Sequence, residues 1–84
     1  MNRIEWKPKA AKQLRKLDRQ HQVIIRDAVT GLSAFPDCRN VKALQKHTHA
    51  YRLRVGQYRV FFEFAGEIKV ITIEEVKKRD ERTY

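Results

Sequence analysis

The order of apolar patterns along this sequence predicts an α+β fold with elements in the order βααβββ. Apolar residues recur every three or four positions across residues 8–35, which is the period of helices with one buried face. Apolar and charged residues instead alternate across much of residues 51–76, which is the period of strands. We therefore expect a small, mainly antiparallel sheet packed on an antiparallel helix pair.

The first half of the chain predicts one strand and two helices. Residues 2–6 form the strand, and Pro8 follows at a position that suits the first turn of a helix. An apolar stripe among basic residues predicts a first helix over residues 8–17. A longer amphipathic pattern predicts a second helix over residues 19–35, with Asp18 placed to cap its start. The join between them is short, so the helices should run antiparallel.

The second half of the chain predicts a loop followed by three strands. Periodicity is weak over residues 38–50, which we interpret as a loop with room for one short strand or turn. The predicted strands cover residues 51–55, 58–64 and 68–76. The last is rich in Ile, Val and Thr on both faces, as expected for a central strand.

A hairpin with an unusual charge pattern joins the first two of these three strands. Gly56 stands at the first central position of the connection, where glycine suits a tight two-residue turn. In that register Arg54 faces Arg59, and Arg52 lies one pleat along on the same open sheet face. Arginines directly opposite one another repel and destabilise a hairpin. Residues 38–62 contain six basic side chains and no acidic one, so this cluster indicates an anionic partner.

Composition limits the classes of protein to which the chain can belong. Its 84 residues fit a single domain, which we place at residues 1–84. The formal net charge of +9 favours nucleic acid or another acidic partner. Cys38 is the only cysteine, which excludes an internal disulfide and a thiolate metal site, and we expect no cofactor. Because no apolar run resembles a signal peptide or a membrane span, we expect a cytoplasmic protein with no membrane partner.

The sequence resembles the RelE/ParE toxin superfamily of bacterial toxin–antitoxin systems over nearly its whole length. The resemblance is carried by the opening strand and Lys-rich helices, by the hairpin YRLRVGQYRV (51–60) and by the ending VKKRDERTY (76–84). It implies a RelE-like fold. RelE-type members are ribosome-dependent endoribonucleases that cut mRNA in the decoding site, whereas ParE-type members inhibit DNA gyrase.

On the RelE side, the resemblance implies a metal-independent endoribonuclease that cleaves translated mRNA and inhibits translation. Its partners would be the ribosome, mRNA and a cognate RelB-like, DNA-binding antitoxin. The antitoxin would neutralise the toxin with an acidic or amphipathic segment that folds over the basic cluster. Two alternatives remain: a ParE-like gyrase inhibitor of the same fold, and a non-catalytic nucleic-acid-binding module.

The resemblance also assigns roles to single residues. Arg52 and Arg54 fall where RelE-type enzymes place lysines on the first hairpin strand. Arg59 matches an arginine that stabilises the phosphate, and Arg79 a basic residue that protonates or stabilises the leaving group. Tyr84 matches an aromatic residue that stacks on or orients the RNA. The nucleic-acid-binding set that we predict is Lys9, Lys12, Lys46, Arg52, Arg54, Arg59, Lys77, Lys78 and Arg79.

Arginine at positions 52 and 54 leaves the general base open. With a pKa above ~12, arginine cannot serve as an ordinary base, although it can clamp a phosphate with two hydrogen bonds. His47 and His49 are the nearby side chains whose unperturbed pKa is close to neutrality. Lys46 or a ribosomal group is the alternative.

Overall fold

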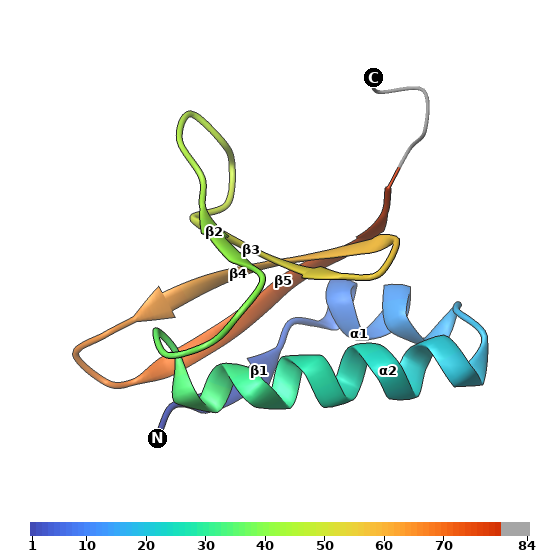
Figure 1. The fold of residues 1–84 in the computed structure, drawn as a ribbon, viewed down its shortest axis with the longest axis horizontal. Helices are drawn as coiled ribbons and strands as arrows, with labels where there is room; N and C mark the ends of the chain where they lie inside the picture. Colours follow the sequence, from blue (N-terminus) through green and yellow to red (C-terminus); the bar gives the residue numbers. More distant parts are fainter. Residues whose placement is uncertain (80–84) are drawn as a thin grey trace.

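The protein, seen in a computed structural model that describes residues 1–79, is one five-stranded sheet with its helices on a single face (Figure 1). Its elements are β1 (Arg3–Trp6), α1 (Pro8–Arg15), α2 (Arg19–Thr30), the 3-10 helix η1 (Gly31–Ala34), β2 (Val41–Ala43), β3 (Tyr51–Val55), β4 (Tyr58–Ala65) and β5 (Val70–Lys78). The strand order is β1-β5-β4-β3-β2. The predicted α+β class is confirmed.

The helices differ from the prediction mainly at their ends. The pattern expected to give one helix over residues 19–35 gives α2 and then η1. Asp18 occupies the N-cap position of α2, but its side chain makes no capping hydrogen bond, so that prediction was wrong. The link between α1 and α2 is held by Gln22, whose Nε2 donates to Leu17 O at 2.7 Å. After η1, at the far end of the helical segment, Asn2 Nδ2 donates to Phe35 O at 2.8 Å.

The hairpin register is the one predicted. Leu53 pairs with Val60 and Arg54 with Arg59, and the turn contains Gly56 at φ +57°. The segment predicted as a loop with room for one short strand or turn contains the strand β2, which pairs antiparallel with β3. The structure also pairs β1 with β5 in parallel, so the sheet is mixed.

The last strand begins later than predicted and carries a bulge. Ile68 was expected to start it, but Ile68 lies in the preceding turn and is 71% exposed. Within the strand, Phe61 pairs with Glu75 while Phe62 pairs with Ile73, so one extra residue is inserted on β5. Such a bulge bends the strand and redirects its side chains.

The core lies between the helices and one face of the sheet. Phe35, which follows η1, extends it through edge contacts with Tyr51, Phe62 and Phe64 at ring-centroid distances of 5.1, 5.5 and 4.9 Å. The buried cluster consists of Ala10, Leu14, Ile25, Val29, Leu32, Leu53, Val55, Tyr58, Val60, Phe62, Ile71, Ile73 and Val76. The opposite face, which we call the open face, carries the loop between β2 and β3 (Figure 1). Over residues 1–79, no helix is both long and apolar enough to cross a membrane.

Candidate nucleic-acid interface

Three cations form a row across the open face. Arg54 on β3 pairs with Arg59 on β4, and Arg59 pairs with Lys77 on β5. Neighbouring strands lie about 5 Å apart, so the three side chains start from adjacent positions. Arg54 and Lys77 are exposed and Arg59 is half-buried. We call Arg54, Arg59 and Lys77 the basic row.

Arg52 lies in the next row of the same face, between Lys42 on β2 and Phe61 on β4. Its Nε is buried and has no hydrogen-bond partner within the described chain. A buried donor without an acceptor costs about 1–3 kcal/mol, which an acceptor on a ligand would relieve. Sequence reasoning missed Lys42, because the segment that holds β2 had been predicted as a loop.

Arg79 directly follows β5 and stays close to the hairpin. Its backbone N–H donates to Gln57 O at 2.6 Å, which holds this end of the chain beside the β3–β4 turn. The turn is adjacent to the basic row, so Arg79 and the row share one end of the sheet. Tyr84, the predicted stacking residue, lies outside the described residues.

The loop between β2 and β3 brings His47 onto the open face. A backbone hydrogen bond from Leu44 N–H to Ala50 O, 2.8 Å long, closes this loop. The His47 ring stacks on Phe61 with a centroid distance of 5.1 Å and an interplanar angle of 16°. His49 N–H donates to His47 Nδ1 at 3.0 Å, which leaves the proton of the neutral imidazole on Nε2.

His49 lies between two carboxylates. Its Nε2 is 3.2 Å from Glu75 Oε2 and its Nδ1 is 3.8 Å from Glu63 Oε2, with only 15% of the side chain exposed. Glu63 Oε2 also accepts the Ala50 N–H at 2.7 Å. Neither His47 nor His49 therefore presents a free basic nitrogen in this arrangement.

Glu75 is the acidic neighbour that the local sequence does not show. It pairs with Phe61 on the open face, and Lys9 Nζ and Lys77 Nζ lie 3.3 and 3.7 Å from its Oε1. Burial acts to raise the pKa of Glu75, but hydrogen bonds from Lys9 and His49 and the charge of Lys77 outweigh it, so the pKa is lowered. The carboxylate therefore stays ionised and orients its three partners.

The remaining predicted cations are not all brought together. Lys12 lies exposed on α1, outside the strands that carry the basic row. Lys78 pairs with Tyr58, whose ring faces α2, so strand alternation places Lys78 on the helix side. Lys46 precedes His47 in the loop and has φ +53°.

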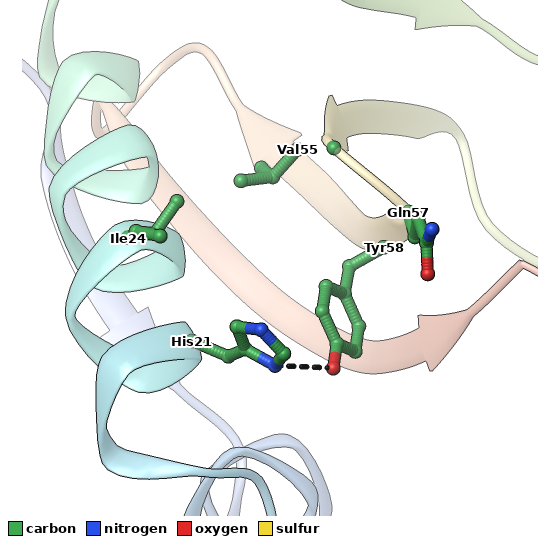
Figure 2. Close-up of a pocket in the computed structure, with 6 residues that line it drawn as sticks. His21, Ile24, Val55, Gln57 and Tyr58 are labelled. Carbon is green, nitrogen blue, oxygen red and sulfur yellow. Dashed lines mark hydrogen bonds between the residues drawn. The ribbon is translucent and has the colours of Figure 1, made fainter.

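A separate apolar pocket of about 200 Å³ lies on the helix side, between α2 and the hairpin turn (Figure 2). Tyr58 Oη and His21 Nδ1 share a hydrogen bond of 2.9 Å at its edge. Ile24 and Val55 supply apolar walls. Within the described chain, no group of three or more His, Cys, Asp or Glu side chains is arranged to hold a metal ion.

A βααββββ fold with cations across its open face defines a toxin of the RelE/ParE superfamily, as the comparisons with known proteins show. Residues 4–83 match the family described as the ParE toxin of the type II toxin–antitoxin system parDE. The chain belongs to this family and is the toxin component of a type II toxin–antitoxin system.

Solved structures of RelE proteins share the fold. The archaeal RelE–RelB complex from Pyrococcus horikoshii OT3 matches with TM-score 0.81 and 27% identity, over 95% of this chain and 97% of that one. The RelBE2 complex from Mycobacterium tuberculosis matches with TM-score 0.79 and 21% identity, over 93% and 98%. The isolated E. coli RelE toxin matches with TM-score 0.79 and 18% identity, over 96% and 87%. No curated protein sequence matches the chain.

Proposed function

We propose that this toxin is a ribosome-dependent endoribonuclease that cleaves translated mRNA in the cytoplasm without a metal ion. The observation that carries the proposal is the basic row. Arg54, Arg59 and Lys77 lie side by side on an open sheet face, and repulsion between them favours an anionic ligand. A phosphodiester supplies that negative charge, and its charge grows during cleavage.

The chemistry would be attack of a ribose 2′-oxygen on the neighbouring phosphorus, with departure of the 5′-oxygen. Arg59 and Arg54 would stabilise the charge on the phosphoryl oxygens, and Arg79 would stabilise the leaving oxygen. One well-placed donor in such a site contributes about 10²–10³-fold to the rate. Because His47 Nδ1 accepts a hydrogen bond and both ring nitrogens of His49 lie near carboxylates, we assign the residues of this chain to charge stabilisation and positioning.

We also propose that a RelB-like antitoxin neutralises the toxin. The structure from P. horikoshii, 27% identical to this chain, is a RelE–RelB complex, and so is the one from M. tuberculosis. An acidic antitoxin segment laid over Arg54 and Arg59 would mask the charges that the ligand needs.

Inhibition of DNA gyrase is the second candidate function. Its support is the family match, because that family is described by the ParE toxin. A gyrase inhibitor would have no need for a phosphate-clamping row on the sheet. A non-catalytic RNA- or DNA-binding module is the third candidate. Its support is that His47 Nδ1 and the ring of His49 already have partners, which leaves this chain without an evident general base.

Mapping mRNA 5′ ends after tightly controlled expression tests these candidates. We expect new 5′ ends only on messages that are being translated, and their loss in Arg59→Ala. Arg19→Ala, which removes an exposed cation at the start of α2 outside the predicted binding set, is the matched control and should cleave like the wild type. Intact mRNA together with accumulated gyrase–DNA breaks would overturn the proposal in favour of the gyrase function.

A further inference from the structure

Phe61 is a buried aromatic residue, but it lies on the open face of the sheet, opposite the core. It is 7% exposed, yet it does not belong to the buried cluster beneath the helices. Its cover consists of two histidines from the β2–β3 loop, His47 at 5.1 Å and His49 at 5.5 Å between ring centroids. The open face therefore carries an aromatic stack of its own.

The loop holds the His47 ring in one orientation. Its ends are tied by the Leu44–Ala50 backbone hydrogen bond, and His49 N–H holds His47 Nδ1 at 3.0 Å. Lys46, directly before His47, has φ +53°, a conformation that costs energy for a residue other than glycine. One face of the ring rests on Phe61, and His47 is an exposed residue, so its side chain keeps surface open to solvent.

The stack has cationic neighbours on the open face. Phe61 and Arg59 are two residues apart on β4 and point to the same face, about 7 Å from one another along the strand. The stack and the basic row are therefore neighbours on the open face. Arg52, directly opposite Phe61, has a buried Nε that finds no hydrogen-bond partner among residues 1–79.

We propose that His47, backed by Phe61, is a stacking platform for one unpaired base of single-stranded RNA whose phosphate lies on the basic row. The inference rests on the proposed function, which places an RNA phosphate on the basic row. It adds a contact between the protein and the base of the nucleotide. Stacking on an aromatic ring accepts any base, so the platform strengthens binding without selecting a sequence. His47 acts here through its ring face, which its hydrogen-bonded Nδ1 leaves available.

Binding of a short fluorescein-labelled RNA, with and without abasic nucleotides, tests the platform on the full chain. Fluorescence anisotropy should show the wild type binding the base-containing RNA about 10-fold more tightly than the abasic one. His47→Ala should abolish this difference and keep the dependence on salt, whereas His47→Tyr should restore the difference. Thr48→Ala, a neighbouring exposed loop residue, should match the wild type.

Arg54→Gln separates the two parts of the site. It should weaken binding of both RNAs equally and reduce the salt slope by about 1, since one phosphate contact is lost. An abasic penalty that is unchanged in His47→Ala would overturn the platform, as would a wild type that binds neither RNA. If the penalty depends on His47 but translated mRNA is not cleaved, the platform stands and the proposed nuclease function fails.

Discussion

Arg54 and Arg59 lie directly opposite each other on β3 and β4, with Lys77 continuing the row on β5. Like charges in directly opposed positions destabilise a sheet. The row therefore lowers the stability of the free protein at the place where an anionic ligand would reverse the sign of the interaction. Under the proposed function, stability and ligand binding would make opposite demands on the same side chains.

The first prediction is that Arg54→Gln makes the protein more stable. Removing one charge from the row should raise the free energy of unfolding by about 0.2–1 kcal/mol. The gain should shrink at high salt, because exposed charges are screened there. Urea denaturation at low and high ionic strength measures both effects. Lys12→Gln on α1 is the control, and an equal gain in that variant would contradict the explanation by the row.

The hairpin was predictable because its determinants are close together in the sequence. Gly56 adopts φ +57°, which sets a two-residue turn, and alternation on either side then determines the register. The opposition of Arg54 and Arg59 follows from these local rules alone.

Other parts of the site depend on contacts that local patterns do not contain. Strand β2 has only three residues, too few to show alternation, so Lys42 was missed. Ile68 is apolar but exposed, so it displaced the predicted start of the last strand by two residues. The bulge on β5 determines that Glu75 reaches the row of Phe61 and Arg52, and pairing between distant strands produces it.

The second prediction concerns Glu75 and acid. Because its pKa is lowered in the folded protein, ionised Glu75 contributes stability that is fully present above its ordinary value of 4.5. That contribution is lost as the pH falls through the lowered folded-state pKa. Glu75→Gln should reduce the free energy of unfolding at pH 7 by about 1–2 kcal/mol and flatten its decline in acid. Urea titrations from pH 7 to pH 3 measure this.

A control for Glu75→Gln is Glu67→Gln, which changes an exposed carboxyl in the turn before β5. We expect Glu67→Gln to keep the acid profile of the wild type. Parallel profiles for wild type and Glu75→Gln below pH 5 would refute the role given to Glu75. The Glu75 variant should also loosen the loop, because His49 loses its charged partner 3.2 Å away.

The third prediction concerns Gln13, whose side chain accepts a hydrogen bond from β5 where no neighbouring strand does so. β1 pairs with β5 only as far as Ile73, so within residues 1–79 the later donors on that side of β5 have no strand partner, although β4 continues on the other side. Gln13 on α1 takes over, accepting the Val76 N–H through Oε1 at 2.7 Å. Gln13→Ala should lower the free energy of unfolding by about 1–2 kcal/mol, measured by thermal and urea denaturation. Gln20→Ala, exposed on α2, should change it little.

The last prediction contrasts two glycines whose added methyl group would meet no atom within 4 Å. Gly31 follows α2 at φ −63°, a conformation open to any residue, so Gly31→Ala should stabilise the protein by about 0.4–1 kcal/mol. Gly56 turns the hairpin at φ +57°, so Gly56→Ala should destabilise it by about 1–2 kcal/mol. Because Gly56 sets the opposition of Arg54 and Arg59, Gly56→Ala should also weaken RNA binding, whereas Gly31→Ala should leave it unchanged. Chemical denaturation and RNA-binding anisotropy on these two variants test the prediction. A change in the free energy of unfolding of the same sign for both substitutions would show that the turn does not control the register.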